Sequence, residues 1–230
     1  MTFSIAALCP RSGALGCAMA TSSMAAGARV LFLEPEVGLV LTQARTDPRL
    51  GAFGLARLAA GRNAEEALAD IVASTPHASW RQLAVIDRHG AVAVHTGADV
   101  MAPKGARIGK SAVAIGNAVA SERVLDAILE GFAASPEAPL TDRLIEALEA
   151  GLAAGGEGIP LGSAGLKATR PGIGYVPIDL RADCSETPIA DVKRYWALWA
   201  PMVDGYVERA LDPANALPAE QIERKSPRSG

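Results

Sequence analysis

Four short apolar runs within the first fifty residues constrain the fold of this chain more than any other feature. They cover residues 2–8, 15–20, 29–33 and 37–41, and short Pro- or Gly-containing turns separate them. Runs of this length joined by tight turns are typical of antiparallel strands. The opening of the chain is therefore predicted to form an antiparallel meander.

Helical and strand-like patterns alternate along the rest of the chain. Apolar residues at helical spacing predict helices over residues 50–60, 63–73, 121–134 and 141–154, and a last helix over 188–211 with a kink at Pro201. Further strands are predicted over residues 81–87, 91–96, 111–115, 162–169 and 175–182.

Most of these strands are apolar on both faces. The first strand carries Phe3 and Ile5 on one side and Ala6 and Leu8 on the other. A strand buried on both faces belongs to a layered structure, so we expect an α+β fold in which helices cover two stacked sheets. We expect one domain over residues 1–211. Residues 212–230 are rich in Pro, Ala and charge, and are expected to form a mobile tail or an arm on a partner.

Composition narrows the class of protein. The 230 residues are 50% hydrophobic, which suffices for one core, and the net charge of −3 comes without a basic stripe for nucleic acid. Three cysteines without a CxxC spacing predict reduced thiols, and neither a metal site nor a cofactor is expected. Uninterrupted apolar stretches fall short of the roughly 18 residues of a membrane span, so we expect a cytoplasmic protein.

Hydroxyl residues at strand ends are the first candidate functional groups. Thr2 begins the first strand, while Thr21 and Ser22 follow the second. Because neighbouring antiparallel strands bring the end of one beside the start of the other, these three residues could line one cleft. The alternative is an ordinary β-branched residue at position 2 and ordinary turn hydroxyls at the other two positions.

A second candidate group follows the fourth strand, where four of five positions are polar: Thr42, Gln43, Arg45 and Thr46. Arg45 could clamp a carboxylate of a small ligand through two hydrogen bonds, although such a segment can equally be a plain loop. Asn117 follows another apolar strand. Its amide could donate to an oxyanion, or it could simply form the turn before the next helix.

Several short motifs together resemble one bacterial family of unknown function, whose fold is similar to that of the N-terminal-nucleophile (Ntn) hydrolases. The resemblance spans about Thr2 to Trp196 and is carried by Thr2–Ala6, Gly13-x-x-Gly16, Ala18–Ser22, Thr42–Ala44, Pro48-x-Leu50-Gly51, Leu58–Gly61, Gln82–Asp87, His95–Gly97, Gly116-Asn117 and Asp179-Leu180-Arg181-x-Asp183. It implies a four-layer α-β-β-α sandwich of two stacked, mainly antiparallel sheets.

The resemblance also implies a chemistry for Thr2. In Ntn hydrolases the first residue of the processed chain attacks an amide carbonyl, and its own α-amine, with a pKa of about 7.7–8.0, serves as the base. Thr2 can take this role only after Met1 is removed, because an amide nitrogen is no base. A proteasome-like site would also need a lysine near the nucleophile, and Lys104 is the first lysine of the chain.

Three hypotheses follow. The leading one is a hydrolase of small amides, with Thr2 as nucleophile and Asn117 or a backbone N–H as oxyanion donor. The second is a non-catalytic module that binds a small carboxylate or amide near Gln43 and Arg45. The third is an oligomeric scaffold. A homo-oligomer is expected because Trp196, Trp199 and Met202 add apolar surface late in the chain, although that surface could equally dock on the core of its own chain.

Overall fold

The computed structural model describes residues 1–227 and contains two antiparallel sheets. The six-stranded sheet has the order β10-β9-β2-β1-β8-β7, with β10 Ile178–Ala182, β9 Ser163–Ala168, β2 Leu15–Thr21, β1 Thr2–Leu8, β8 Ala112–Asn117 and β7 Lys104–Gly109. The four-stranded sheet has the order β3-β4-β5-β6, with β3 Leu31–Glu34, β4 Gly38–Ala44, β5 Arg81–Asp87 and β6 Val92–Thr96.

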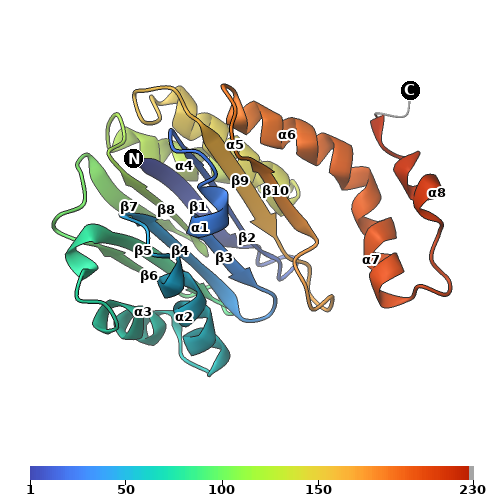
Figure 1. Ribbon diagram of the computed structural model, residues 1–230, viewed down its shortest axis with the longest axis horizontal. Coiled ribbons are helices and arrows are strands. Elements are labelled where there is room, and N and C mark those ends of the chain that lie inside the picture. The colour runs from blue at the N-terminus through green and yellow to red at the C-terminus, as the bar shows by residue number, and fades with distance from the viewer. Residues whose placement is uncertain (228–230) are drawn as a thin grey trace.

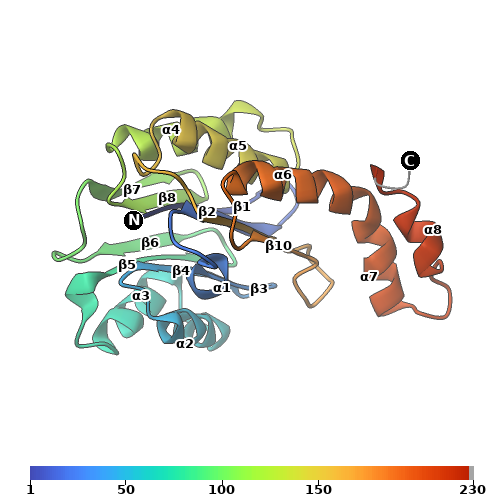
Figure 2. The same cartoon turned by 45° about the horizontal axis from the view of Figure 1, so that its top comes forward.

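The two sheets stack, and helices cover their outer faces (Figures 1 and 2). The four-stranded sheet is covered by α2 Pro48–Ala59 and α3 Ala64–Ala73. The six-stranded sheet is covered by α4 Arg123–Ala134, α5 Leu140–Ala153 and α6 Pro188–Trp199. The mixed α+β sandwich expected from the sequence is therefore confirmed.

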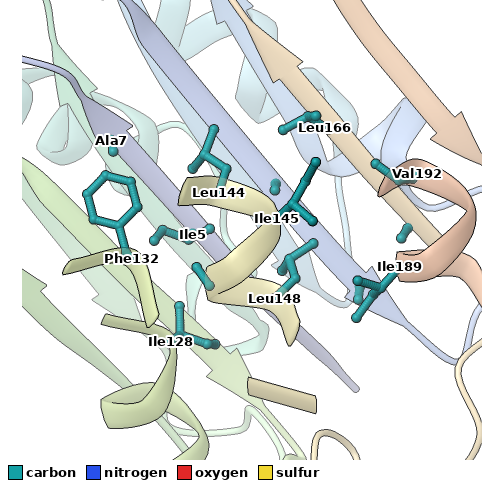
Figure 3. Close-up of a cluster of buried hydrophobic side chains, with 14 of the residues drawn as sticks. Ile5, Ala7, Ile128, Phe132, Leu144, Ile145, Leu148, Leu166, Ile189 and Val192 are labelled. Carbon is teal, nitrogen blue, oxygen red and sulfur yellow. The ribbon is translucent and has the colours of Figure 1, made fainter. Parts of the chain in front are cut away.

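Strand β1 lies inside the six-stranded sheet and is buried on both faces. Phe3, Ile5 and Ala7 point toward the helices, and Figure 3 shows Ile5 and Ala7 near side chains of α4 and α5 such as Phe132 and Leu144. The intervening residues point toward the other sheet, where a second core lies that includes the residues Ala6, Met19, Leu41, Ile86 and Ile115. The small and aliphatic side chains let the two sheets approach closely.

The first four strands do not form one meander. β1 and β2 pair in the six-stranded sheet, whereas β3 and β4 pair in the other sheet. The short helix α1, Gly27–Val30, occupies the start of the predicted strand 29–33, and it carries the chain from one sheet to the other. The prediction treated sequence neighbours as sheet neighbours, which tight turns favour but do not require.

The last part of the chain forms an arm beyond α6 (Figures 1 and 2). The predicted break near Pro201 is present, since a 3₁₀ turn, Ala200–Met202, separates α6 from α7, Val203–Leu211. Within the expected tail lies a further short helix, α8, Ala219–Glu223, whose buried Ile222 packs on Gly205. Residues 228–230 lie outside the described part. None of the helices within residues 1–227 has the length and apolar character needed to cross a membrane.

Candidate functional site

A row of polar residues crosses the six-stranded sheet at the end where β1 begins. Thr2 pairs with Asn117 of β8, and Asn117 pairs with Lys104 of β7. On the other side of β1, Thr21 of β2 pairs with Ser163 of β9. Residues directly opposite in an antiparallel pair share a face, so the sheet aligns these side chains with one another.

The carbonyl of Met1 links the two threonines of this row. Thr21 Oγ1 donates to the Met1 oxygen at 2.9 Å, and Thr2 Oγ1 donates to the same oxygen. Thr2 and Thr21 are both buried. The structure thus brings together Thr2, Thr21 and Asn117, three of the residues singled out in the sequence. With Met1 in place, the nitrogen of Thr2 is an amide.

A buried amide network holds Asn117 from the opposite sheet. Asn117 Nδ2 donates to Gln82 Oε1 at 3.1 Å, and Gln43 Nε2 donates to the same oxygen at 2.8 Å. Ser4 Oγ in turn donates to Gln43 Oε1 at 2.6 Å. Gln82 Nε2 donates to the carbonyl oxygen of Gly116 at 2.9 Å. Gln43 is fully buried in this network, so its side chain links the two sheets and does not face a cleft.

A buried glutamate lies beside Ser22. Glu157 Oε2 accepts a hydrogen bond from the backbone nitrogen of the candidate residue Ser22 at 2.9 Å. Glu157 Oε1 is buried without a hydrogen-bond partner among the described residues. Because a buried carboxylate oxygen without a partner is costly, this end of β2 favours a positive or hydrogen-bonding group.

Two pockets lie near the start of β1, and Met1 lines the smaller of them. The smaller one has a volume of about 170 Å³ and is lined by Met1, Ala44, Arg45, Trp80, Asp99, Val100, Met101 and Asn117. The larger and more open one has a volume of about 390 Å³ and is lined by Arg45, His77, Trp80 and Arg81. Arg45 and Trp80 line both pockets, so the two lie next to each other, and together they are called the cleft.

Two residues beside the cleft have a left-handed backbone. Ala44, which lines the smaller pocket, has φ of 71°, and Ala118, which follows Asn117, has φ of 47°. This region is unfavourable for residues other than glycine, and such strain concentrates at functional sites. Strand β4 reaches Ala44, so Thr42 and Gln43 belong to the strand and not to the loop after it.

The two remaining threonines of the second candidate group lie apart from the cleft lining. Thr42 is buried, and its hydroxyl donates to the carbonyl oxygen of Asp47 at 3.3 Å. Thr46 donates to the carbonyl oxygen of Ala44 at 3.3 Å. Both hydroxyls therefore organise the turn between β4 and α2.

Asp47 ends this turn and begins α2. Its carboxylate accepts from the backbone nitrogen of Arg49 at 3.1 Å and from the Arg49 side chain at 2.9 and 2.8 Å, and Arg81 lies 3.9 Å away. The hydrogen bond from the Arg49 side chain lowers the pKa of Asp47 below its ordinary value, with the charge of Arg81 contributing. Asp47 therefore stays ionised near the cleft.

Several residues of the site were missed in the sequence. Trp80, Gln82 and Glu157 lie far from Thr2 along the chain, and no local pattern marks Trp80 or Glu157. Lys104 lies far from Thr2 along the chain, although strand pairing places it in the polar row. Its ammonium donates to the carbonyl oxygens of Gly97 and Ala98 at 2.8 and 2.6 Å. The family motifs around Gln82 and Gly116-Asn117 were the available signal.

Comparison with known proteins identifies the family but no activity. Residues 2–192 match the model of a family of unknown function, DUF1028. A crystal structure described as protein SPO2555 from Silicibacter pomeroyi, of the same family model, is similar with 31% sequence identity and a TM-score of 0.80, over 86% of this chain and 89% of that one. No curated protein matches the chain. The chain therefore belongs to DUF1028, a family of unknown function.

Proposed function

We propose that the protein hydrolyses amide bonds of small molecules, with Thr2 as the nucleophile once Met1 has been removed. The observation that carries this proposal is the position of Thr2. It lies between Thr21 and Asn117 at the start of a central strand, and Met1, which is bonded to it, lines a pocket together with Asn117. Removing Met1 would join that pocket to the Thr2 hydroxyl and create a free α-amine.

The chemistry is a nucleophilic acyl transfer in two stages. The α-amine of Thr2 takes the proton of Oγ1 while Oγ1 attacks the amide carbon. The tetrahedral intermediate then collapses, and the leaving amine takes the proton from the α-ammonium, which leaves the acyl group as an ester on Thr2. Water, deprotonated by the same amine, attacks the ester and releases the acid, which restores the hydroxyl.

Asn117 supports the negative charge that develops in this reaction. One Nδ2 hydrogen is directed to Gln82, so the second hydrogen can donate to the oxyanion. The buried contact with Gln82 fixes the amide in place before the substrate arrives. The similarity of the fold to the Ntn hydrolases, noted from the sequence motifs, also supports this assignment, but fold alone does not establish function.

The test is hydrolysis of a library of small amides by three variants of the natively processed chain. Thr2→Ala keeps the α-amine but lacks the hydroxyl, and we expect it to lose at least about a thousandfold in kcat/KM. Thr2→Ser keeps a hydroxyl and should retain activity. Thr187→Ala is the control, because Thr187 is exposed and its side chain makes no capping bond at α6. Unchanged hydrolysis by Thr2→Ala would overturn the proposal.

One observation favours a second candidate function, a non-catalytic module that binds a small carboxylate or amide. The carbonyl oxygen of Met1 accepts from both Thr2 and Thr21, so a chain that keeps Met1 has an ordered, unreactive end beside the same cleft. This function predicts that Met1 can stay in place and that Thr2→Ala binds ligand as the unmodified chain does.

A further inference from the structure

The position of the Arg45 guanidinium suits the binding of an anion. Arg45 is exposed, and its Cζ lies 4.7 Å from the centre of the Trp80 ring. Among residues 1–227, no carboxylate lies within 4.0 Å of this guanidinium, whereas other arginines of the chain form such pairs. The guanidinium is planar, and an arginine that lies over an aromatic ring can still direct its in-plane N–H donors to a carboxylate.

Backbone contacts fix both partners of this stack. The backbone nitrogen of Arg45 donates to the carbonyl oxygen of Trp80 at 3.4 Å, and Arg81 Nη1 donates to the carbonyl oxygen of Arg45. Trp80 ends the 3₁₀ turn Ala78–Trp80. That turn packs so closely on Gly97 that a Cβ at position 97 would lie 2.2 Å from the Ser79 carbonyl oxygen. These contacts fix the backbone from which both side chains extend, which reduces the cost of ordering them on binding.

The charges around the larger pocket favour an anion. Arg81 is a second cation in its lining, and its side chain is only 13% exposed. The nearest acid, Asp47, lies 3.9 Å from Arg81 but only 2.8 Å from Arg49, so it neutralises Arg81 incompletely. Asp99 lines the smaller pocket only. A carboxylate in the larger pocket would thus face two guanidinium groups.

We propose that the larger pocket is a carboxylate subsite, so that the substrates are amides carrying a carboxylate, such as N-acyl amino acids. This inference rests on the proposed function for the cleavage step, but not for binding. Arg45 would pair with the carboxylate, and the face of Trp80 would contact planar or apolar parts of the ligand. The amide bond would then lie in the smaller pocket, near Asn117 and the start of β1.

Binding of matched probes tests the subsite without requiring catalysis. Hippurate and N-acetylphenylalanine are each compared with their primary carboxamides by calorimetry on the Thr2→Ala chain. We expect each carboxylate to bind at least about tenfold more tightly than its neutral counterpart, as a charge-assisted contact predicts. The preference should decrease as salt is raised.

Variants at Arg45 test whether the preference for carboxylates over carboxamides depends on this residue. Arg45→Gln should remove most of it, since only Arg81 then faces the carboxylate, and Arg45→Lys should keep a larger part although the planar guanidinium is lost. Arg88→Gln is the matched control, since Arg88 is exposed at the opposite end of β5. The inference is wrong if neither carboxylate is preferred, or if Arg45→Gln keeps the preference undiminished.

The outcomes separate this inference from the proposed function. An Arg45-dependent preference in a chain that cleaves no amide would support the subsite and contradict Thr2 catalysis. Thr2-dependent cleavage that treats acids and carboxamides alike, with or without Arg45, would support catalysis and overturn the subsite.

Discussion

At the scale of single residues, Gln82 connects the two sheets beneath the candidate site. Its Oε1 accepts from Gln43 and Asn117, and its Nε2 donates to the Gly116 carbonyl oxygen. Gln43 and Asn117 are buried, so their amide groups would each lose this partner if the Gln82 amide were removed. The orientation of Asn117 therefore depends on a residue that does not touch the cleft.

Replacing Gln82 by Leu tests this connection. We expect Gln82→Leu to destabilise the fold by about 3 kcal/mol or more, because each buried group left unpaired costs about 1–3 kcal/mol. Ser4→Ala is the matched control, since it removes only one donor to Gln43 and should cost about 1 kcal/mol. Denaturant unfolding measures both. Equal losses in the two variants would show that Gln82 has no special role.

At the scale of elements, the start of α2 fixes the turn that carries Arg45. Asp47 is the N-cap residue of this helix, with Pro48 at its first position. The Asp47 carboxylate also accepts from the Arg49 side chain and lies near Arg81. The Asp47 carboxylate thus both caps α2 and pairs with positively charged side chains.

Asp47→Ala should therefore lose stability in a pH-dependent way. At neutral pH we expect a loss of about 1 kcal/mol, the usual value for an N-cap. The folded pKa of Asp47 is lowered relative to the unfolded chain, so its contribution is fully present above the unfolded pKa of about 3.9 and is lost as pH falls through the folded pKa. Unfolding free energies from pH 7 to 3 should converge for the two proteins. A constant difference would contradict this assignment.

Most elements could be predicted from the sequence because their apolar residues keep a clear period. Strand β7 was missed: Lys104–Gly109 carries two glycines, one lysine and one arginine, which hides the strand pattern. The extension of β4 through Gln43 was missed for a related reason. Gln43 is polar yet buried, because its amide is satisfied by Ser4 and Gln82, a contact that sequence periodicity cannot reveal.

At the scale of the whole molecule, the candidate site combines segments that are distant in the chain. Sequence motifs identified Thr2, Thr21, Arg45 and Asn117, which lie in the polar row or line the cleft. They could not identify Trp80, because its place beside Arg45 depends on the pairing of β4 with β5. The position of Trp80 beside Arg45 therefore follows from the register of the strands, which the local sequence pattern does not give.

A homo-oligomer stays a prediction, but the surface expected to form the contact between copies is a different one. Trp196 and Trp199 pack against the core of their own chain and Met202 is buried, so these residues do not form a free apolar surface. The arm of α7 and α8, which extends from the two-sheet body and exposes Leu211, is the better candidate contact (Figure 1). Light scattering should give a multiple of the chain mass, and a single-chain mass at all concentrations would contradict this.

The most direct test of the account is the intact mass of the natively expressed, untagged protein. We predict a mass that is lower by one methionine residue, because only then does Thr2 carry the free amine that the proposed reaction needs as its base. A mass with Met1 fully retained would contradict Thr2 catalysis. It would leave the cleft beside Asn117 and Arg45 as a binding site alone.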